Sequence, residues 1–291
     1  MKDVNQRPLG DAADRSYATK LDRFSRFAEP ELRRAIDDLG IRAGDRILDA
    51  GCGVGLVTRW LGERVGKSGT VIGLDLSMPH LRVAMNASGA GFVQGDLAGP
   101  CLNDASVDLI WCCNTLNHLA RPVDALIRLR ATLRRGASLA LAQSSFLPEM
   151  YFAWDARLED QVRQACYRYY REKYGLSAAE TAGTRRLVGM MLEAGYASVA
   201  TRTYVIERVQ PLSERDQEYF SGAVFEGYWG PKLKPYLAGD DWLALQSWCN
   251  PASSAYCLDR ADFHHIQTLT VVRGFAHTAA LGSAPAPHIA A

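Results

Sequence analysis

The sequence lacks the features that mark membrane, secreted and nucleic-acid-binding proteins. No apolar run approaches the ~20 residues that a membrane-spanning helix needs. Residues 1–10 are polar and contain no apolar core of a signal peptide. The formal net charge of the 291-residue chain is only +1, so no overall field attracts nucleic acid or an anionic membrane. We therefore expect a cytoplasmic protein with neither a nucleic-acid nor a membrane partner.

Paired cysteine motifs are also missing. The seven cysteines are an odd number, and no two of them have the C-x-x-C spacing of zinc and redox sites. This pattern predicts reduced thiols, no disulfide framework and no metal site. The remaining composition is that of a globular chain, 48% hydrophobic and 22% charged. The length suits one large α/β domain with additions, or two modest domains.

Apolar runs and helical patterns alternate from residue 46 onward. Near-continuous apolar strands between helices are typical of a parallel sheet that is covered on both faces. After residue 145 the pattern changes to aromatic helical segments, and two alternating segments, 197–209 and 265–273, read as strands. They could form a hairpin whose connection, 211–262, has grown into a cap. The earlier predicted strands are 46–50, 70–76, 91–95, 107–113 and 137–143, and the predicted helices are 55–65, 78–87 and 121–134.

A glycine-rich loop follows the first predicted strand, with Asp49 at the strand end and then Gly51, Gly53 and Gly55. Glycine lets a ligand lie directly on the backbone, because it has no Cβ and tolerates positive φ. The G-x-G-x-x-G spacing of dinucleotide sites is absent, and the Asp49 carboxylate would repel a pyrophosphate. The loop therefore suits a ligand with a positive end and no phosphate.

Two further acids end the next two strands. Asp75 is placed to accept hydrogen bonds from ribose hydroxyls, and Asp96 from an adenine amino group. Leu97 follows Asp96 and would supply backbone contact and an apolar wall. Because open α/β sheets bind ligands at the carboxyl ends of their strands, these acids and the glycine loop are expected at one site.

In this order and spacing, the motifs resemble those of class I S-adenosylmethionine-dependent methyltransferases. The resemblance covers roughly residues 41–145, and it departs from the family only in the turn 134–137, which lacks the usual Lys-Pro-Gly-Gly. It implies a Rossmann-like, seven-stranded, mostly parallel sheet with an antiparallel last strand and helices on both faces, plus helical cap insertions. The motifs are Asp49-x-Gly51-x-Gly53-x-Gly55, Gly73-Leu-Asp75-Leu-Ser77, Gly95-Asp96, residues 107–110 and residues 116–126.

The resemblance implies S-adenosyl-L-methionine as cofactor and assigns roles to residues. Asp49 would lie near the ammonium end of the methionine part, and the carbonyl of Asn114 would accept from its amine. Tyr17 would close over the cofactor, and Cys52 would be a packed residue of the loop rather than a nucleophile. The complete expected cofactor set is Tyr17, Asp49, Gly51, Cys52, Gly53, Gly55, Asp75, Leu76, Asp96, Leu97 and Asn114.

A general base is needed only if the methyl acceptor must lose a proton. His118 is the first candidate, although a histidine in this place more often serves the cofactor side or the structure. Of His264 and His265 only one can face inward, since neighbouring strand residues point to opposite faces, and both could simply be core or surface histidines. The predicted catalytic set is His118, Glu149 and His265.

The aromatic residues of the cap are the expected substrate-binding elements, unless most of these rings only pack the cap onto the sheet. We expect a bacterial enzyme of secondary metabolism that methylates an apolar small molecule at O, N or C. A non-methylating cyclisation or rearrangement, and a non-catalytic cofactor-binding partner protein, stay open as alternatives, and so does a homodimer. The predicted substrate residues are Trp154, Tyr167, Phe225, Tyr228 and Trp229.

The predicted organisation places one cofactor-binding core between additions. The expected segments are an N-terminal helical lid (1–40), the core (41–148), a helical cap insertion (149–183), a continuation of the core (184–210), a second cap insertion (211–262), the last core strand (263–281) and a disordered tail (282–291).

Overall fold

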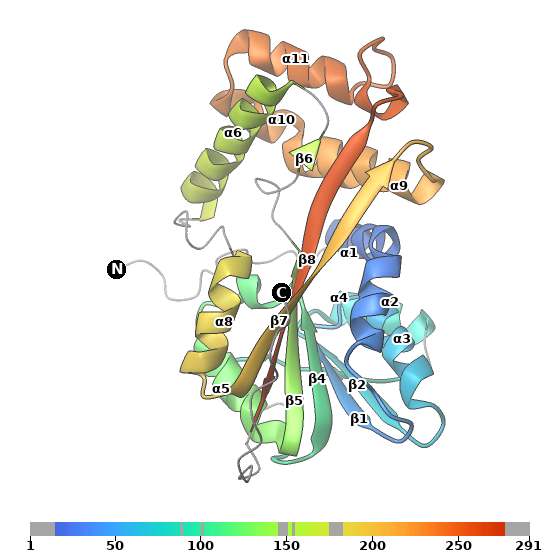
Figure 1. Cartoon of the computed structure of the whole chain (residues 1–291), viewed down its shortest axis with the longest axis vertical. Helices are drawn as coiled ribbons and strands as arrows, with labels where there is room; N and C mark the ends of the chain where they lie inside the picture. Colours follow the sequence, from blue (N-terminus) through green and yellow to red (C-terminus); the bar gives the residue numbers. More distant parts are fainter. Residues whose placement is uncertain are drawn as a thin grey trace, which may run out of the picture.

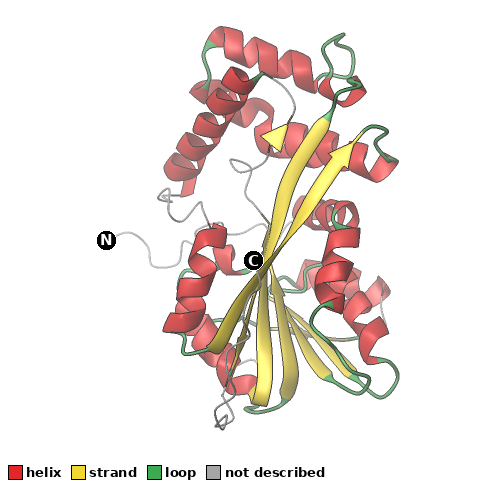
Figure 2. Ribbon diagram, in the orientation of Figure 1, coloured by secondary structure: helices red, strands yellow, loops and turns green. Residues whose placement is uncertain are grey.

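A twisted mixed sheet forms the centre of the molecule (Figures 1 and 2). The computed structural model describes residues 15–87, 90–99, 102–144, 151–152, 155–174 and 183–276. The predicted tail at 282–291 lies outside these ranges. No helix within them is long and apolar enough to cross a membrane.

The sheet has the predicted class of topology. Its order is β3-β2-β1-β4-β5-β8-β6, and β7 also pairs with β8. The first five strands are parallel, whereas β8 runs antiparallel to β5 and lies between β5 and β7. The additional strand β6 has two residues and was not predicted. The strands are β1 (Arg46–Ala50), β2 (Thr70–Asp75), β3 (Gly91–Gln94), β4 (Val107–Cys113), β5 (Leu133–Ser144), β6 (Tyr151–Phe152), β7 (Ala197–Val209) and β8 (His264–Phe275).

Helices cover both faces of the sheet and create two apolar cores. On one face α2 (Glu29–Asp37) and α3 (Leu56–Val65) bury their apolar sides against β1, β4 and β5, with Trp60 and Trp111 fully enclosed. On the other face α5 (Pro122–Thr132) and α8 (Gly183–Glu193) pack against the alternate residues of β4, β5 and β8. This two-sided burial explains the near-continuous apolar strands.

The predicted junction between the helix at 121–134 and the strand at 137–143 is wrong. The helical pattern was expected to continue to residue 134, but α5 ends at Thr132 and β5 begins at Leu133. Leu133 is already extended, and it pairs with Val107 of β4 before a register shift. The ladder of hydrogen bonds to β4 therefore overrides the local helical periodicity.

The predicted hairpin between the last two strands is confirmed. β7 and β8 pair over their whole length and extend beyond the carboxyl ends of the parallel strands, where their connection becomes helical (Figure 1). Helix α6 (Ala156–Tyr174) and the helices of this connection are together called the cap. The connection contains α9 (Glu214–Glu218), the π-helix η3 (Tyr219–Trp229), α10 (Gly230–Leu233), η4 (Lys234–Tyr236), α11 (Gly239–Cys249) and η5 (Cys257–Asp259).

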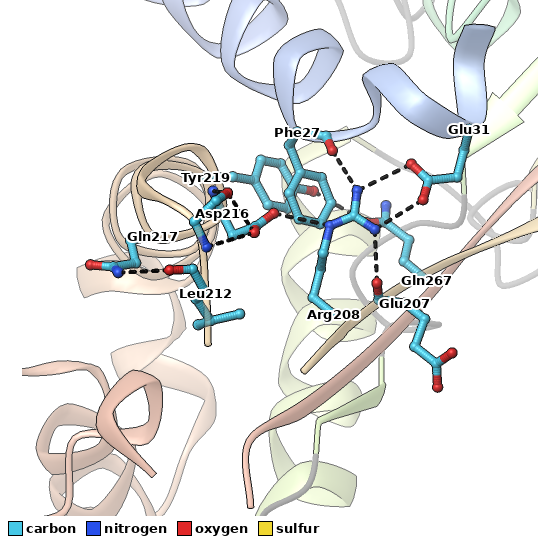
Figure 3. A network of polar contacts seen from close by, with 10 residues as sticks. Phe27, Glu31, Glu207, Arg208, Leu212, Asp216, Gln217, Tyr219 and Gln267 are labelled. Carbon is cyan, nitrogen blue, oxygen red and sulfur yellow. Dashed lines mark hydrogen bonds and ion pairs between the residues drawn. The ribbon is translucent and has the colours of Figure 1, made fainter. Parts of the chain in front are cut away.

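A half-buried guanidinium joins the N-terminal helices to the hairpin and the cap (Figure 3). Arg208 of β7 is paired with Glu31 of α2 and with Asp216 of α9, and it also donates to the carbonyl of Phe27. Phe27 ends α1 (Arg15–Phe27), and its ring stacks on Tyr219 with centroids 3.9 Å apart. The N-terminal helices, the hairpin and the cap therefore meet at one cation.

Candidate active site at the carboxyl edge of the sheet

The glycine loop follows β1 and turns directly into α3. Gly51, Gly53 and Gly55 all have positive φ, of 80°, 52° and 78°, a region that side-chain-bearing residues rarely adopt. A Cβ on Gly51 would overlap Oγ1 of Thr115, which follows β4. Glycine is therefore required at Gly51 for two reasons, the positive φ and the close packing of the backbone against Thr115.

Asp75 lies at the end of β2 and accepts hydrogen bonds from two backbone N–H groups. Gly53 N donates to its Oδ2 at 2.9 Å, and Ser77 N donates to its Oδ1 at 2.8 Å. His80 Nδ1 lies 3.6 Å from Oδ1. Burial opposes ionisation of Asp75, but His80 and the two N–H donors outweigh it and lower its pKa. Asp75 is therefore an ionised carboxylate that is fixed to the glycine loop.

Asp49 is enclosed beneath the loop rather than exposed at its rim. Its carboxyl is 2% exposed and accepts a hydrogen bond from Oγ1 of Thr58 at 2.6 Å. Burial raises its pKa to about 7, opposed by Thr58 and reinforced by the charge of Asp75. Its role near the cofactor's ammonium end stays a prediction. Cys52 is also buried, and desolvation together with these acids raises the pKa of its thiol, as expected for a packed residue.

The expected adenine side of the site follows β2 and β3. Asp96 is half-buried, and its Oδ1 accepts from the backbone N–H of Ala98 at 2.9 Å. Leu97 is buried, whereas Leu76 is 45% exposed. Tyr17 lies in α1, with its side chain outside the described structure. The nucleoside roles of these residues stay predictions.

Asn114 follows β4 in a left-handed conformation, with φ at 52°. Its Oδ1 accepts from Nε2 of Gln143 and from both the N–H and the hydroxyl of Ser144, at 2.9, 2.9 and 3.0 Å. Gln143 in turn accepts from Nδ2 of Asn117 at 2.8 Å. The carboxyl ends of β4 and β5 are thus connected by side-chain amides.

Several of these contacts were not anticipated from the sequence. Thr58, Thr115 and His80 were missed because each meets its partner only across the folded loop. Gln143 could have been found from the sequence, because it is a polar residue at the end of the predicted apolar strand 137–143. In the structure it is only 4% exposed and therefore needs hydrogen-bond partners.

The three predicted bases are placed differently. His118 ends η1 (Leu116–His118) at the carboxyl edge and is half-buried. Glu149 lies outside the described residues. His265 is completely buried, with its ring edge-on to Phe220 at 4.8 Å, and burial lowers its pKa to about 3. His265 is therefore neutral and packed, which leaves His118 as the best placed of the described candidates.

The predicted substrate residues belong to the cap. Phe225 and Trp229 are buried and stack with centroids 5.6 Å apart, and Tyr167 is half-buried on α6. The side chain of Tyr228 and the whole of Trp154 lie outside the described structure. The described members of this set therefore pack within the cap, and their contact with substrate stays a prediction.

A family model for a methyltransferase domain matches residues 48–141, which span the glycine loop and strands β1 to β5. This is the region that holds Asp75, Asp96 and Asn114 around the loop. Residues 48–141 therefore form a methyltransferase domain. S-adenosylmethionine is accordingly the cofactor of this methyltransferase domain.

Relatives and solved structures agree with this assignment. The malonyl-[acyl-carrier protein] O-methyltransferase of Pseudescherichia vulneris is 32% identical over 53% of this chain and 61% of its own length. The nocamycin O-methyltransferase of Saccharothrix syringae is 40% identical over 29% of this chain and 32% of its own. The chain thus spans less than two thirds of either relative. A methyltransferase structure from Aquifex aeolicus shares the fold, with a TM-score of 0.50 and 22% identity over 65% of this chain and 91% of that one.

The chemistry of the residues at the methyltransferase site fits this cofactor. Three glycines hold the loop after β1 at positive φ, and Asp75 is an ionised carboxylate at the adjacent strand end. Within the described ranges, no group of three or more His, Cys, Asp or Glu residues could hold a metal ion. Metal independence itself stays a prediction, which activity in the presence of a chelator would test.

Proposed function

We propose that this protein transfers a methyl group from S-adenosylmethionine to an apolar small molecule, at an O, N or C atom. One observation carries the proposal: the glycine loop, the ionised Asp75 and the left-handed Asn114 meet at one edge of the sheet, which the aromatic cap extends beyond. A site of this kind has to bind the cofactor and the acceptor, align them and exclude water from the reaction.

The sulfonium of the bound cofactor supplies an activated methyl group. The chain has to hold the acceptor in line with that methyl, and alignment alone provides much of the rate enhancement. In our proposal Asp75 holds the ribose, Asp96 the adenine and Asn114 the methionine amine. His118 receives the acceptor's proton where the acceptor is a hydroxyl or an acidic carbon. Glu149 and His265 remain secondary candidates.

The acceptor class is inferred from the cap and from the relatives. The cap core is built largely from aromatic and aliphatic side chains, including Phe220, Phe225 and Trp229. Two relatives are O-methyltransferases, and one is named for nocamycin. These features favour an apolar natural-product acceptor in bacterial secondary metabolism. The formal net charge of only +1 favours this class over a nucleic-acid or membrane partner, and the proposal places the protein in the cytoplasm.

The test combines binding with product analysis. Calorimetry should detect S-adenosylhomocysteine binding, and incubation of S-adenosylmethionine with a panel of phenols, carboxylic acids and amines should give methylated product and S-adenosylhomocysteine in equal amounts. His118→Ala should slow turnover of a hydroxyl acceptor by roughly 100-fold or more, while His264→Ala, at an exposed position of β8, should not.

Other outcomes would replace the proposal. Acceptor rearrangement without S-adenosylhomocysteine release would indicate a cyclase or isomerase that only binds the cofactor. Cofactor binding without consumption in any reaction would indicate a non-catalytic partner protein. Absence of cofactor binding would contradict the proposal altogether.

A further inference from the structure

A chain of hydrogen-bonded amides crosses the ends of β4 and β5, beneath the proposed position of the cofactor's methionine part. Asn117 Nδ2 donates to Gln143 Oε1 at 2.8 Å, and Gln143 Nε2 donates to Asn114 Oδ1 at 2.9 Å and to the carbonyl of Ser144 at 3.1 Å. Gln143 is 4% exposed, so its amide depends on these partners rather than on solvent.

The direction of this chain is fixed by one backbone group. The N–H of Ser144 can only donate, and it lies 2.9 Å from the Asn114 side chain, which must therefore present its oxygen there. The Gln143 atom that faces the same oxygen must then be its NH₂ group, and its own oxygen must accept from Asn117. Since every link has a defined donor, the network specifies one orientation of each amide.

The chain ends on a residue with an unusual backbone. Asn114 has a φ of 52°, a left-handed conformation that asparagine adopts more readily than most residues but less readily than glycine. Its own N–H donates to the carbonyl of Ala142, and its side-chain oxygen accepts three hydrogen bonds. Of the residues that donate those three bonds, Gln143 contributes solely through its side chain.

We propose that Gln143 is a positioning residue for cofactor binding. By donating to Oδ1 of Asn114, Gln143 holds the left-handed backbone of Asn114. The backbone carbonyl of Asn114 then faces the methionine amine. Asn117 orients Gln143 from its other end. The inference rests on the proposed function, because it assigns Asn114 to the cofactor, and it adds a residue that touches neither cofactor nor acceptor.

The test uses charge and protonation at position 143 in the full-length protein, with S-adenosylhomocysteine as the calorimetric probe. The ionised carboxylate of Gln143→Glu can accept from Asn117 but cannot donate to Asn114, so the affinity of this variant at about pH 8 should fall roughly tenfold relative to wild type. Burial at this position, which is 4% exposed, should raise the pKa of the glutamic acid above its usual value of about 4.3. Lowering the pH to about 5 then protonates a large share of the molecules, and the O–H can donate to Asn114. The affinity relative to wild type at the same pH should therefore recover.

Two variants separate positioning from general damage. Gln143→Met has a similar shape but no donor, and it should bind weakly at both pH values. Gln246→Glu makes the same substitution on the exposed side of α11 and should match wild type throughout. If Gln143→Glu does not fold, Asn117→Asp serves instead, because the ionised carboxylate of that variant cannot donate to Gln143 and regains a donor at low pH.

The outcomes of the test distinguish the two proposals. Failure of the wild type to bind S-adenosylhomocysteine would remove the proposed function. Wild-type binding combined with unchanged affinity in Gln143→Glu at about pH 8, or with no recovery at about pH 5, would overturn the role of Gln143 while leaving the proposed function intact.

Discussion

Arg208 and Glu31 form a two-pronged ion pair across 177 residues of sequence, with Nη1–Oε1 at 2.9 Å and Nη2–Oε2 at 3.1 Å (Figure 3). Both side chains are 14% exposed, and Asp216 completes the site from the cap at 2.9 Å. Burial opposes the charge of Arg208, but these two acids outweigh it and raise the pKa of the guanidinium. The pair therefore connects helix α2 to the hairpin that carries the cap.

Breaking this pair should destabilise the fold far more than breaking an exposed one. Arg208→Met leaves Glu31 and Asp216 without their cation in a largely buried position, which should cost about 2–4 kcal/mol in the free energy of unfolding. Arg202→Met, also on β7, removes an arginine that pairs with Asp38 but is 66% exposed, and should cost less than about 1 kcal/mol. Urea unfolding of both variants checks this, and equal losses would contradict it.

Gly51→Ala should lower stability because its Cβ would collide with Thr115, and this effect can be separated from backbone strain. Gly51 and Gly136 have nearly the same φ, 80° and 79°, but a Cβ on Gly136 meets nothing within 4 Å, whereas one on Gly51 overlaps Thr115. Gly136→Ala should therefore cost about 1 kcal/mol of stability. Gly51→Ala should cost clearly more and weaken S-adenosylhomocysteine binding. Thermal unfolding and calorimetry test both variants. Wild-type stability and affinity in Gly51→Ala would show that Thr115 can move away from the added Cβ.

Asp75→Ala should weaken cofactor binding by about 1–3 kcal/mol, because it removes the proposed ribose contact and releases the N–H of Gly53 from the carboxylate. The control is Asp108→Ala, at the opposite end of the sheet, where Asp108 accepts from the N–H of Arg46 and pairs with Arg134. That variant should lose stability but keep its affinity. Unchanged calorimetric affinity in Asp75→Ala would count against the proposed site.

Asp49 should make stability fall as the pH rises. Its pKa is raised to about 7 in the folded protein and is about 3.9 in an unfolded chain, so the folded state binds the extra proton between these values. The stabilisation is complete below about pH 4 and is lost as the pH rises through about 7. Asp49→Asn keeps an acceptor for Thr58 and removes this titration.

The free energy of unfolding of Asp49→Asn should therefore rise relative to wild type between about pH 4 and pH 7, by at most about 4 kcal/mol at 1.36 kcal/mol per pKa unit. Chemical denaturation at several pH values measures it, with Asp104→Asn, in an exposed turn, as the control. Parallel pH profiles for wild type and Asp49→Asn would refute the prediction.

Local signals in the sequence were enough to predict most of the core. The strand endings at Asp49, Asp75 and Asn114 follow from apolar runs bounded by polar residues and glycine, and β1 and β4 agree with their predicted bounds. The boundary at Leu133 was wrong because pairing with β4 decides it. A periodic pattern shows which side of a segment is apolar. It carries no information about the neighbouring strand that pairs with the end of the segment.

By itself the sequence determined the succession of strands and helices along the chain and the glycine loop after the first strand, because these depend on residues that are close in the chain. Only the tertiary structure decided that Asp49 is buried against Thr58, that Gln143 bridges Asn117 to Asn114 and that Arg208 joins the N-terminal helices to the cap. The physical reason is that burial and hydrogen-bond partners depend on residues brought together by packing, and packing sets both the pKa of a carboxyl and the stability of an ion pair.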